Sequence, residues 1–76
     1  MIGIEGTLAL LGEKVRRAQL LYPWPTDGSP VRTMLIALME EVGELAKELL
    51  ENGSAQRVRE EALDVCVVAF RIVAGE

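Results

Sequence analysis

Two groups of acidic residues with the same internal spacing are the part of this sequence best suited to chemistry. Glu41 and Glu44 are three residues apart, and so are Glu61 and Asp64. Residues i and i+3 share one face of an α-helix, so each group presents a pair of carboxylates. If the two helices pack antiparallel, the four side chains can converge. Carboxylates that close repel one another, so the pattern predicts a cation or water among them.

A hard divalent cation suits such a group of oxygen ligands. Mg²⁺ takes carboxylate oxygens, and Mn²⁺ can substitute for it, whereas the chain has no histidine to attract zinc or iron. The alternative is a solvated acidic face that pairs with Arg57 and Arg71, which helical spacing places on the same side as Glu61 and Asp64. We expect the metal site.

Composition limits the class of protein. The chain has 76 residues, half of them hydrophobic, and a net charge of −4. So short a chain buries little apolar surface alone, which predicts one domain over residues 1–76 and a homo-oligomer that shares a core. The negative charge disfavours a nucleic-acid polymer as partner, and no apolar run reaches the roughly 20 residues that span a membrane. With one cysteine, Cys66, and no secretory-signal pattern at the start, we expect a cytoplasmic protein.

Apolar periodicity predicts three helices. The first runs from Thr7, as its N-cap, to about Tyr22, and a loop with three prolines follows. Ser29 and Pro30 are a helix-start signal, because the serine oxygen can accept amide N–H groups and proline suits the first helical position. The second helix should therefore extend from there to about residue 51.

The segment Asn52-Gly53-Ser54 supplies a helix stop and a new N-cap, so residues 55–74 should form a third helix, antiparallel to the second. The second helix is apolar over more than half its circumference and the third nearly all round. The sequence thus predicts an all-α fold in which the hairpin dimerises into a four-helix bundle. The N-terminal helix should pack outside it or against the partner, and two dimers could pair as a tetramer.

These motifs resemble those of a known family, the all-α nucleoside triphosphate pyrophosphohydrolases of the MazG type. The family signature is E-E-x-x-E, a spacer and E-x-x-D, and this chain reads Glu40-Glu41-x-x-Glu44, sixteen residues and Glu61-x-x-Asp64. The likeness extends over about residues 33–73, including "EEVGELAKELL" and "REEALDVCVVAFRI". It implies magnesium-dependent hydrolysis of a nucleoside triphosphate to the monophosphate and pyrophosphate. The implied role is house-cleaning, the removal of non-standard or surplus nucleotides.

The resemblance also implies metal-ligand roles for Glu41, Glu44, Glu61 and Asp64. A carboxylate beside the metal can orient or deprotonate the attacking water, and we assign that role first to Glu44 and second to Glu40. Phosphoribosyl-ATP pyrophosphohydrolases share the fold and the acidic signature, and the sequence does not separate the two activities.

Family members continue past the second motif into a helix that closes the nucleotide pocket, whereas this sequence ends at Glu76. We expect either that a second subunit completes the pocket or that the chain is a fragment or a reduced form. The alternative of another class is a non-catalytic helical assembly module that retains the acidic hairpin. Trp24, between two prolines, could stack on a nucleobase or cap the small core, and Cys66 is expected to be a small core residue.

Overall fold

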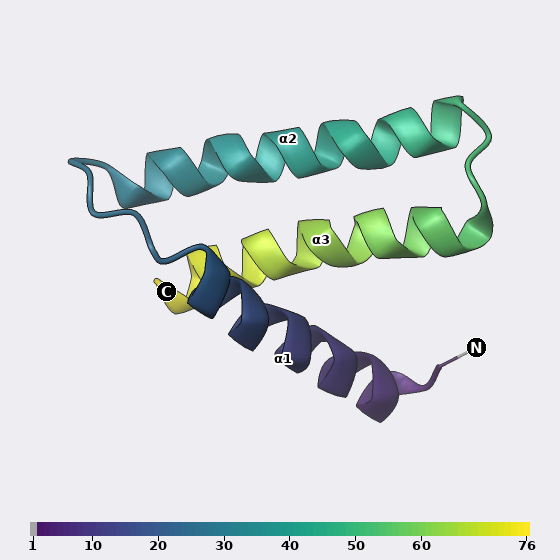
Figure 1. The fold of residues 1–76 in the computed structure, drawn as a ribbon, viewed down its shortest axis with the longest axis horizontal. Helices are drawn as coiled ribbons and strands as arrows, with labels where there is room; N and C mark the ends of the chain where they lie inside the picture. Colours follow the sequence, from purple (N-terminus) through teal and green to yellow (C-terminus); the bar gives the residue numbers. More distant parts are fainter. Residues whose placement is uncertain (1) are drawn as a thin grey trace.

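The computed structural model describes residues 2–76, which form three helices and no strand (Figure 1). These are α1 (Ile4–Leu21), α2 (Pro30–Leu50) and α3 (Ala55–Ala74). The all-α prediction is therefore confirmed. Helices α2 and α3 lie antiparallel along most of their length. Helix α1 packs on α3 and diverges from the hairpin, and among the residues that the structure describes no Cα atom of α1 lies within 8 Å of one in α2. Within the described residues, no helix has the length and apolar character that a membrane span requires.

Helix α1 begins three residues before the predicted Thr7. Its N-cap is Gly3, whose extended backbone needs no side-chain cap, and whose carbonyl accepts both the backbone N–H and the hydroxyl of Thr7 at 2.9 Å. Thr7 thus lies one turn inside the helix and bonds backwards to residue i−4, as threonine can do within helices. The prediction that Thr7 is the N-cap was wrong.

Helix α2 begins at the predicted residue, but its start is held by a different side chain. Ser29 occupies the N-cap position without a side-chain cap bond. Asp27 instead accepts the Ser29 N–H at 2.9 Å through Oδ1 and the Thr33 hydroxyl at 2.6 Å through Oδ2. The bond from Thr33, followed by that from Ser29, holds the pKa of Asp27 below its usual value, because both stabilise the charged form.

The turn between α2 and α3 sets the register of the hairpin. Asn52 adopts a left-handed conformation with φ 56°, and the Gly53 N–H donates to the Glu48 carbonyl at 2.7 Å. A Cβ at Gly53 would lie 3.0 Å from that carbonyl oxygen, so the chain approaches too closely for a larger residue without movement. The Ser54 hydroxyl then accepts the Arg57 N–H at 3.2 Å and caps α3 as predicted.

The buried part of the described chain is small, and none of its side chains is completely inaccessible to solvent. It consists of one side chain each from α1 and α2 and two from α3, namely Val15, Met34, Val67 and Arg71. Leu38 and Leu45 on α2 are half-buried, but most other large apolar side chains of that helix are exposed. Cys66 is exposed as well, so in the single chain it is not the core residue that we expected.

Candidate metal centre

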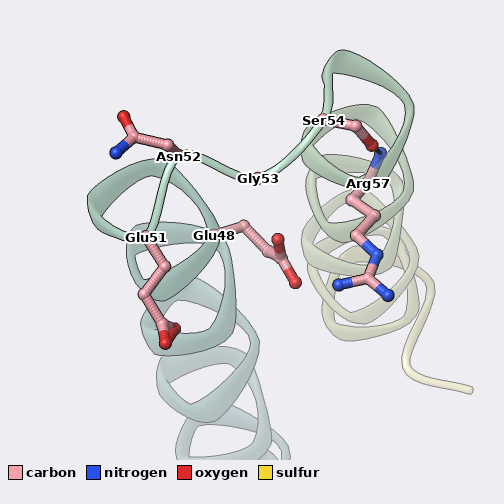
Figure 2. A pocket seen from close by; sticks show the side chains of 6 residues that line it. All are labelled: Glu48, Glu51, Asn52, Gly53, Ser54 and Arg57. Atoms are coloured by element: carbon pink, nitrogen blue, oxygen red, sulfur yellow. Dashed lines mark hydrogen bonds between the residues drawn. The ribbon is translucent and has the colours of Figure 1, made fainter.

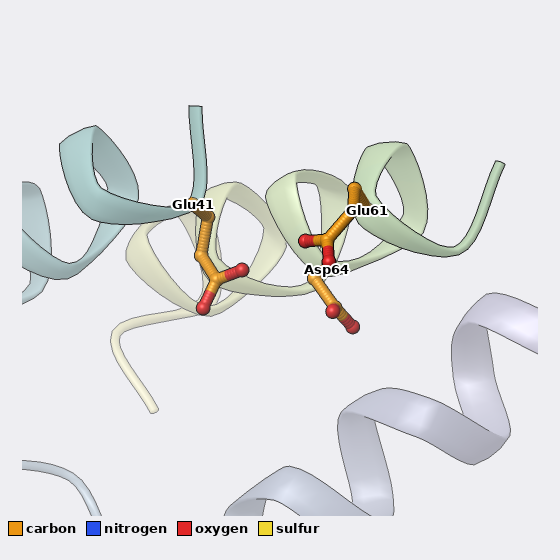
Figure 3. Close-up of side chains that lie close together, drawn as sticks. All are labelled: Glu41, Glu61 and Asp64. Carbon is orange, nitrogen blue, oxygen red and sulfur yellow. The ribbon is translucent and has the colours of Figure 1, made fainter. Parts of the chain in front are cut away.

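Three of the four predicted carboxylates meet at one point in the fold. Glu41 lies in the middle of α2, and Glu61 and Asp64 lie on successive turns of α3. One carboxylate oxygen from each lies within 4.8 Å of the others. Figure 3 shows the three side chains leaving the hairpin on the same side and pointing toward α1. The short turn at residues 51–54 brings them level, because it fixes how the antiparallel helices are aligned.

The three carboxylates lie close together among further acids that repel them. All three residues are half-buried. Burial and then repulsion by Asp64, Glu61, Glu44 and Glu40 raise the pKa of Glu41 above its usual value. The pKa of Glu61 is raised as well, first by its desolvation and then by Asp64 and Glu44 among the neighbouring acids. Folding therefore concentrates negative charge here, a cost that a bound cation would reverse.

The geometry suits a small hard cation. Ligand oxygens around one Mg²⁺ at about 2.1 Å lie roughly 3 to 4 Å from each other, and the observed limit of 4.8 Å is close enough for carboxylate rotation to reach that spacing. The donor set consists of oxygen alone, because neither the only cysteine nor any histidine joins it. Glu41, Glu61 and Asp64 therefore fit Mg²⁺ or Mn²⁺ better than a soft metal.

Glu44 and Glu40 lie beside this group and are exposed. Glu44 follows Glu41 by almost one turn of α2, and its charge contributes to the raised pKa of both Glu41 and Glu61. Glu40 contributes to that of Glu41. The structure thus brings together Glu41, Glu61 and Asp64 and leaves Glu44 at their edge, where it can face water.

Trp24 lies in the connection before α2 and is half-buried. Glu41 follows Pro30, the first residue of α2, by eleven residues, which is about 16 Å along a helix axis. Trp24 therefore belongs to the end of the molecule where α2 begins, while the acidic group lies at mid-helix. Its half-burial matches the core-capping alternative that we considered for it.

A hollow lies at the hairpin turn, with a volume of about 390 Å³. Figure 2 shows its lining, which comes from both helix ends and the turn: Glu48, Glu51, Asn52, Gly53, Ser54 and Arg57. Within the described residues, the acids of this hollow do not converge as those of the central group do. We therefore place the candidate functional site at Glu41, Glu61 and Asp64.

Arg71 differs most from its expected environment. For Arg71 the sequence left open an ion pair with Glu61 or Asp64 and a contact to phosphate, and in the part of the chain that is described no acidic side chain pairs with it. The residue is 3% exposed, and its Nη2 has no hydrogen-bond partner. Spacing could have indicated its position, because it follows Asp64 by seven residues on the same face of α3. Spacing could not have shown its burial.

Comparison of the chain with protein-family models, with curated proteins and with solved structures gives no match. The acidic group, its surroundings and the sequence pattern that predicted it are therefore the features of this chain that indicate a function.

Proposed function

We propose that this chain is a magnesium-dependent nucleotide pyrophosphohydrolase, which converts a nucleoside triphosphate to its monophosphate and pyrophosphate. The observation that carries the proposal is the convergence of Glu41, Glu61 and Asp64 within 4.8 Å, half-buried and mutually repelling. Such a cluster costs stability unless it serves a ligand of opposite charge. The E-E-x-x-E and E-x-x-D motifs in which these residues occur resemble those of the MazG-type enzymes.

The proposed mechanism gives each acid a role. Glu41, Glu61 and Asp64 would hold Mg²⁺, which would supply positive charge to offset the negative charge of the phosphate groups. Glu44, exposed at the edge of the group, would accept a hydrogen bond from the attacking water and take its proton as the water attacks phosphorus at the α–β anhydride. The bond between that phosphorus and the bridging oxygen breaks, which gives the monophosphate and pyrophosphate. Glu40 is the second choice for this role. The substrate would be a non-standard or surplus nucleotide, with phosphoribosyl-ATP as the alternative.

We further propose that the working form is a homodimer, or a pair of such dimers, in the cytoplasm. Leu35, Met39, Val42, Ala46 and Leu49 recur on α2 at alternating intervals of four and three residues, and all are exposed. This is the spacing of a seam between packed helices. Met39 is 63% exposed and Leu49 is 60% exposed. The stripe therefore presents apolar surface to water in the single chain, which is typical of an interaction surface.

Light scattering tests the dimer. Val42→Lys places a charge in the middle of the stripe and should give monomers at micromolar concentration. Leu20→Lys is the matched control, because Leu20 is exposed on α1, away from the stripe. If Val42→Lys has the same molar mass as the wild-type oligomer, this stripe of α2 is not the interface.

The exposed stripe also favours one alternative function, that of an assembly module without catalysis. The two functions differ in a single assay. Pyrophosphate release is measured over a panel of nucleoside triphosphates with magnesium, for wild type, Glu61→Gln and the control Glu13→Gln, whose carboxylate is on α1. An enzyme releases pyrophosphate, loses it in Glu61→Gln and keeps it in Glu13→Gln. An oligomer that releases none is the assembly module.

A further inference from the structure

Arg71 is the most deeply buried ionisable residue in the described chain, and it is incompletely bonded. Its Nε donates to the backbone oxygen of Glu76 at 3.0 Å, while Nη2 has no partner. A guanidinium carries five N–H donors and cannot lose its charge in a protein. Burying such a donor unsatisfied costs more than burying an apolar side chain of the same size. The place of Arg71 in the last turn of α3 and its bond to Glu76 offset part of this cost, but Nη2 remains a buried donor without a partner.

Its place in the fold relates Arg71 to the acidic group. Arg71 follows Asp64 by seven residues on α3, which is about 10 Å along the helix axis and only about 20° around it. Arg71 belongs to the last turn of α3, and Figure 1 shows that the last turns of α1 and α3 lie together at one end of the fold. A bound molecule that extends from the carboxylates toward this end would meet a positive charge.

We propose that Arg71 is an oxyanion site, which binds a phosphoryl oxygen of the ligand whose metal ion is held by Glu41, Glu61 and Asp64. Arginine suits this role because its planar fork can donate two parallel hydrogen bonds to one phosphate group. The identity of the ligand rests on the proposed function, whereas the anion site itself rests on the buried, unpartnered nitrogen. Arg71 would position the nucleotide and takes no part in proton transfer.

Access to Arg71 requires a local movement that the fold permits. Helix α1 packs on α3, while in the described residues none of its Cα atoms lies within 8 Å of a Cα atom of α2, so α3 is its main packing partner. The residues next to Arg71 toward the end of the chain, Gly75 and Glu76, are exposed. Elements with few packing contacts open at low free-energy cost, so a ligand can reach a nitrogen that is covered in its absence.

The test uses inorganic pyrophosphate as the probe and titration calorimetry as the readout, with magnesium present. Arg71→Met should weaken pyrophosphate binding by roughly ten- to hundredfold, the effect of a lost hydrogen bond to a charged group. Arg71→Lys keeps the positive charge but loses the planar guanidinium with its two parallel donors. Its affinity for pyrophosphate should lie between those of Arg71→Met and wild type. Arg59→Met is the matched control, an exposed arginine on another face of α3, and should bind as wild type does.

A second readout separates a ligand site from a structural role. Without ligand, Arg71→Met should melt at or above the wild-type temperature, because it removes a buried charge. Wild-type affinity in Arg71→Met, or no pyrophosphate binding by wild type, overturns the proposal. So does a lower melting temperature or a weaker dimer in Arg71→Met with unchanged affinity, which would assign Arg71 to packing or to a carboxylate of a second copy.

Two further results keep this test separate from the enzyme hypothesis. If Arg71→Met does not fold, the comparison of Arg71→Lys with wild type decides, and equal affinity overturns the proposal. If wild type binds pyrophosphate through Arg71 but hydrolyses no nucleotide, the anion site stands and the proposed function fails. If wild type hydrolyses a nucleotide but its pyrophosphate affinity does not depend on Arg71, the anion site fails and the proposed function stands.

Discussion

Replacing Glu41 by glutamine removes one of three negative charges that folding brings together, with almost no change in shape. Two unit charges 4.8 Å apart, the outer limit for the carboxylate oxygens here, repel by about 1 kcal/mol at the dielectric constant of water and about 3.5 kcal/mol at an effective value of 20. Because Glu41 and Asp64 are half-buried, their repulsion lies between these limits. We expect Glu41→Gln to stabilise the metal-free chain by about 1 to 3 kcal/mol.

The assay is thermal unfolding followed by circular dichroism, at pH 7, low ionic strength and one fixed protein concentration, first with a chelator and then with millimolar magnesium. In the chelator, Glu41→Gln should melt several degrees higher than wild type, since about 1 kcal/mol corresponds to about 4 to 8 °C for a domain of this size. Magnesium should raise the melting temperature of wild type more than that of the variant, because an ion that binds only the folded state stabilises it. Glu13→Gln, on α1, is the control and should match wild type in both conditions.

Two results would refute this reasoning. A lower melting temperature for Glu41→Gln in the chelator would mean that Glu41 stabilises the fold through a contact rather than being repelled by its neighbours. If the difference in melting temperature between Glu41→Gln and wild type is the same in the chelator and in magnesium, no cation binds this carboxylate. Either result would remove the physical basis of the metal centre.

Three further predictions concern the pH dependence and the helix ends. The pKa of Glu41 is raised from 4.5, so the folded chain binds more protons above that pH than the unfolded chain does. Metal-free stability should therefore fall as the pH rises from about 4.5 through the folded-state pKa, and unfolding of Glu41→Gln across this range should show a flatter profile. Asp27→Ala should lower the melting temperature more than Ser29→Ala, because Asp27 holds the start of α2 and the Ser29 side chain makes no cap bond. Gly53→Ala should destabilise the hairpin by about 1 kcal/mol or more in urea unfolding, because its methyl group would crowd the Glu48 carbonyl.

The sequence predicted the hairpin well because its signals are local. Pro30 begins α2, and Ser54 caps α3 at the expected residue. The capping details were less predictable: we expected the Ser29 oxygen to cap α2, whereas Asp27 accepts the Ser29 N–H and the Thr33 hydroxyl, contacts that depend on the conformation of the loop. The start of α1 was missed because a glycine cap carries no side-chain signal.

The candidate site was predictable to the extent that it follows from spacing. The i, i+3 pairs and the antiparallel hairpin bring Glu41, Glu61 and Asp64 together. Glu44 is exposed and does not belong to the convergent group. Residues three apart differ by about 60° around a helix axis, so both members of such a pair need not face α3. The burial of Arg71 depends on how three helices meet, which no local signal encodes.

Pyrophosphate release from a nucleoside triphosphate in the presence of magnesium tests the central proposal most directly. We predict release by wild type, loss of both metal affinity and turnover in Glu61→Gln, and in Glu44→Gln a fall in kcat larger than the change in nucleotide affinity, because orienting the water matters mainly in the transition state. No release by wild type from any nucleotide of the panel, or wild-type turnover in Glu61→Gln, would contradict the proposal that these acids form a catalytic metal centre.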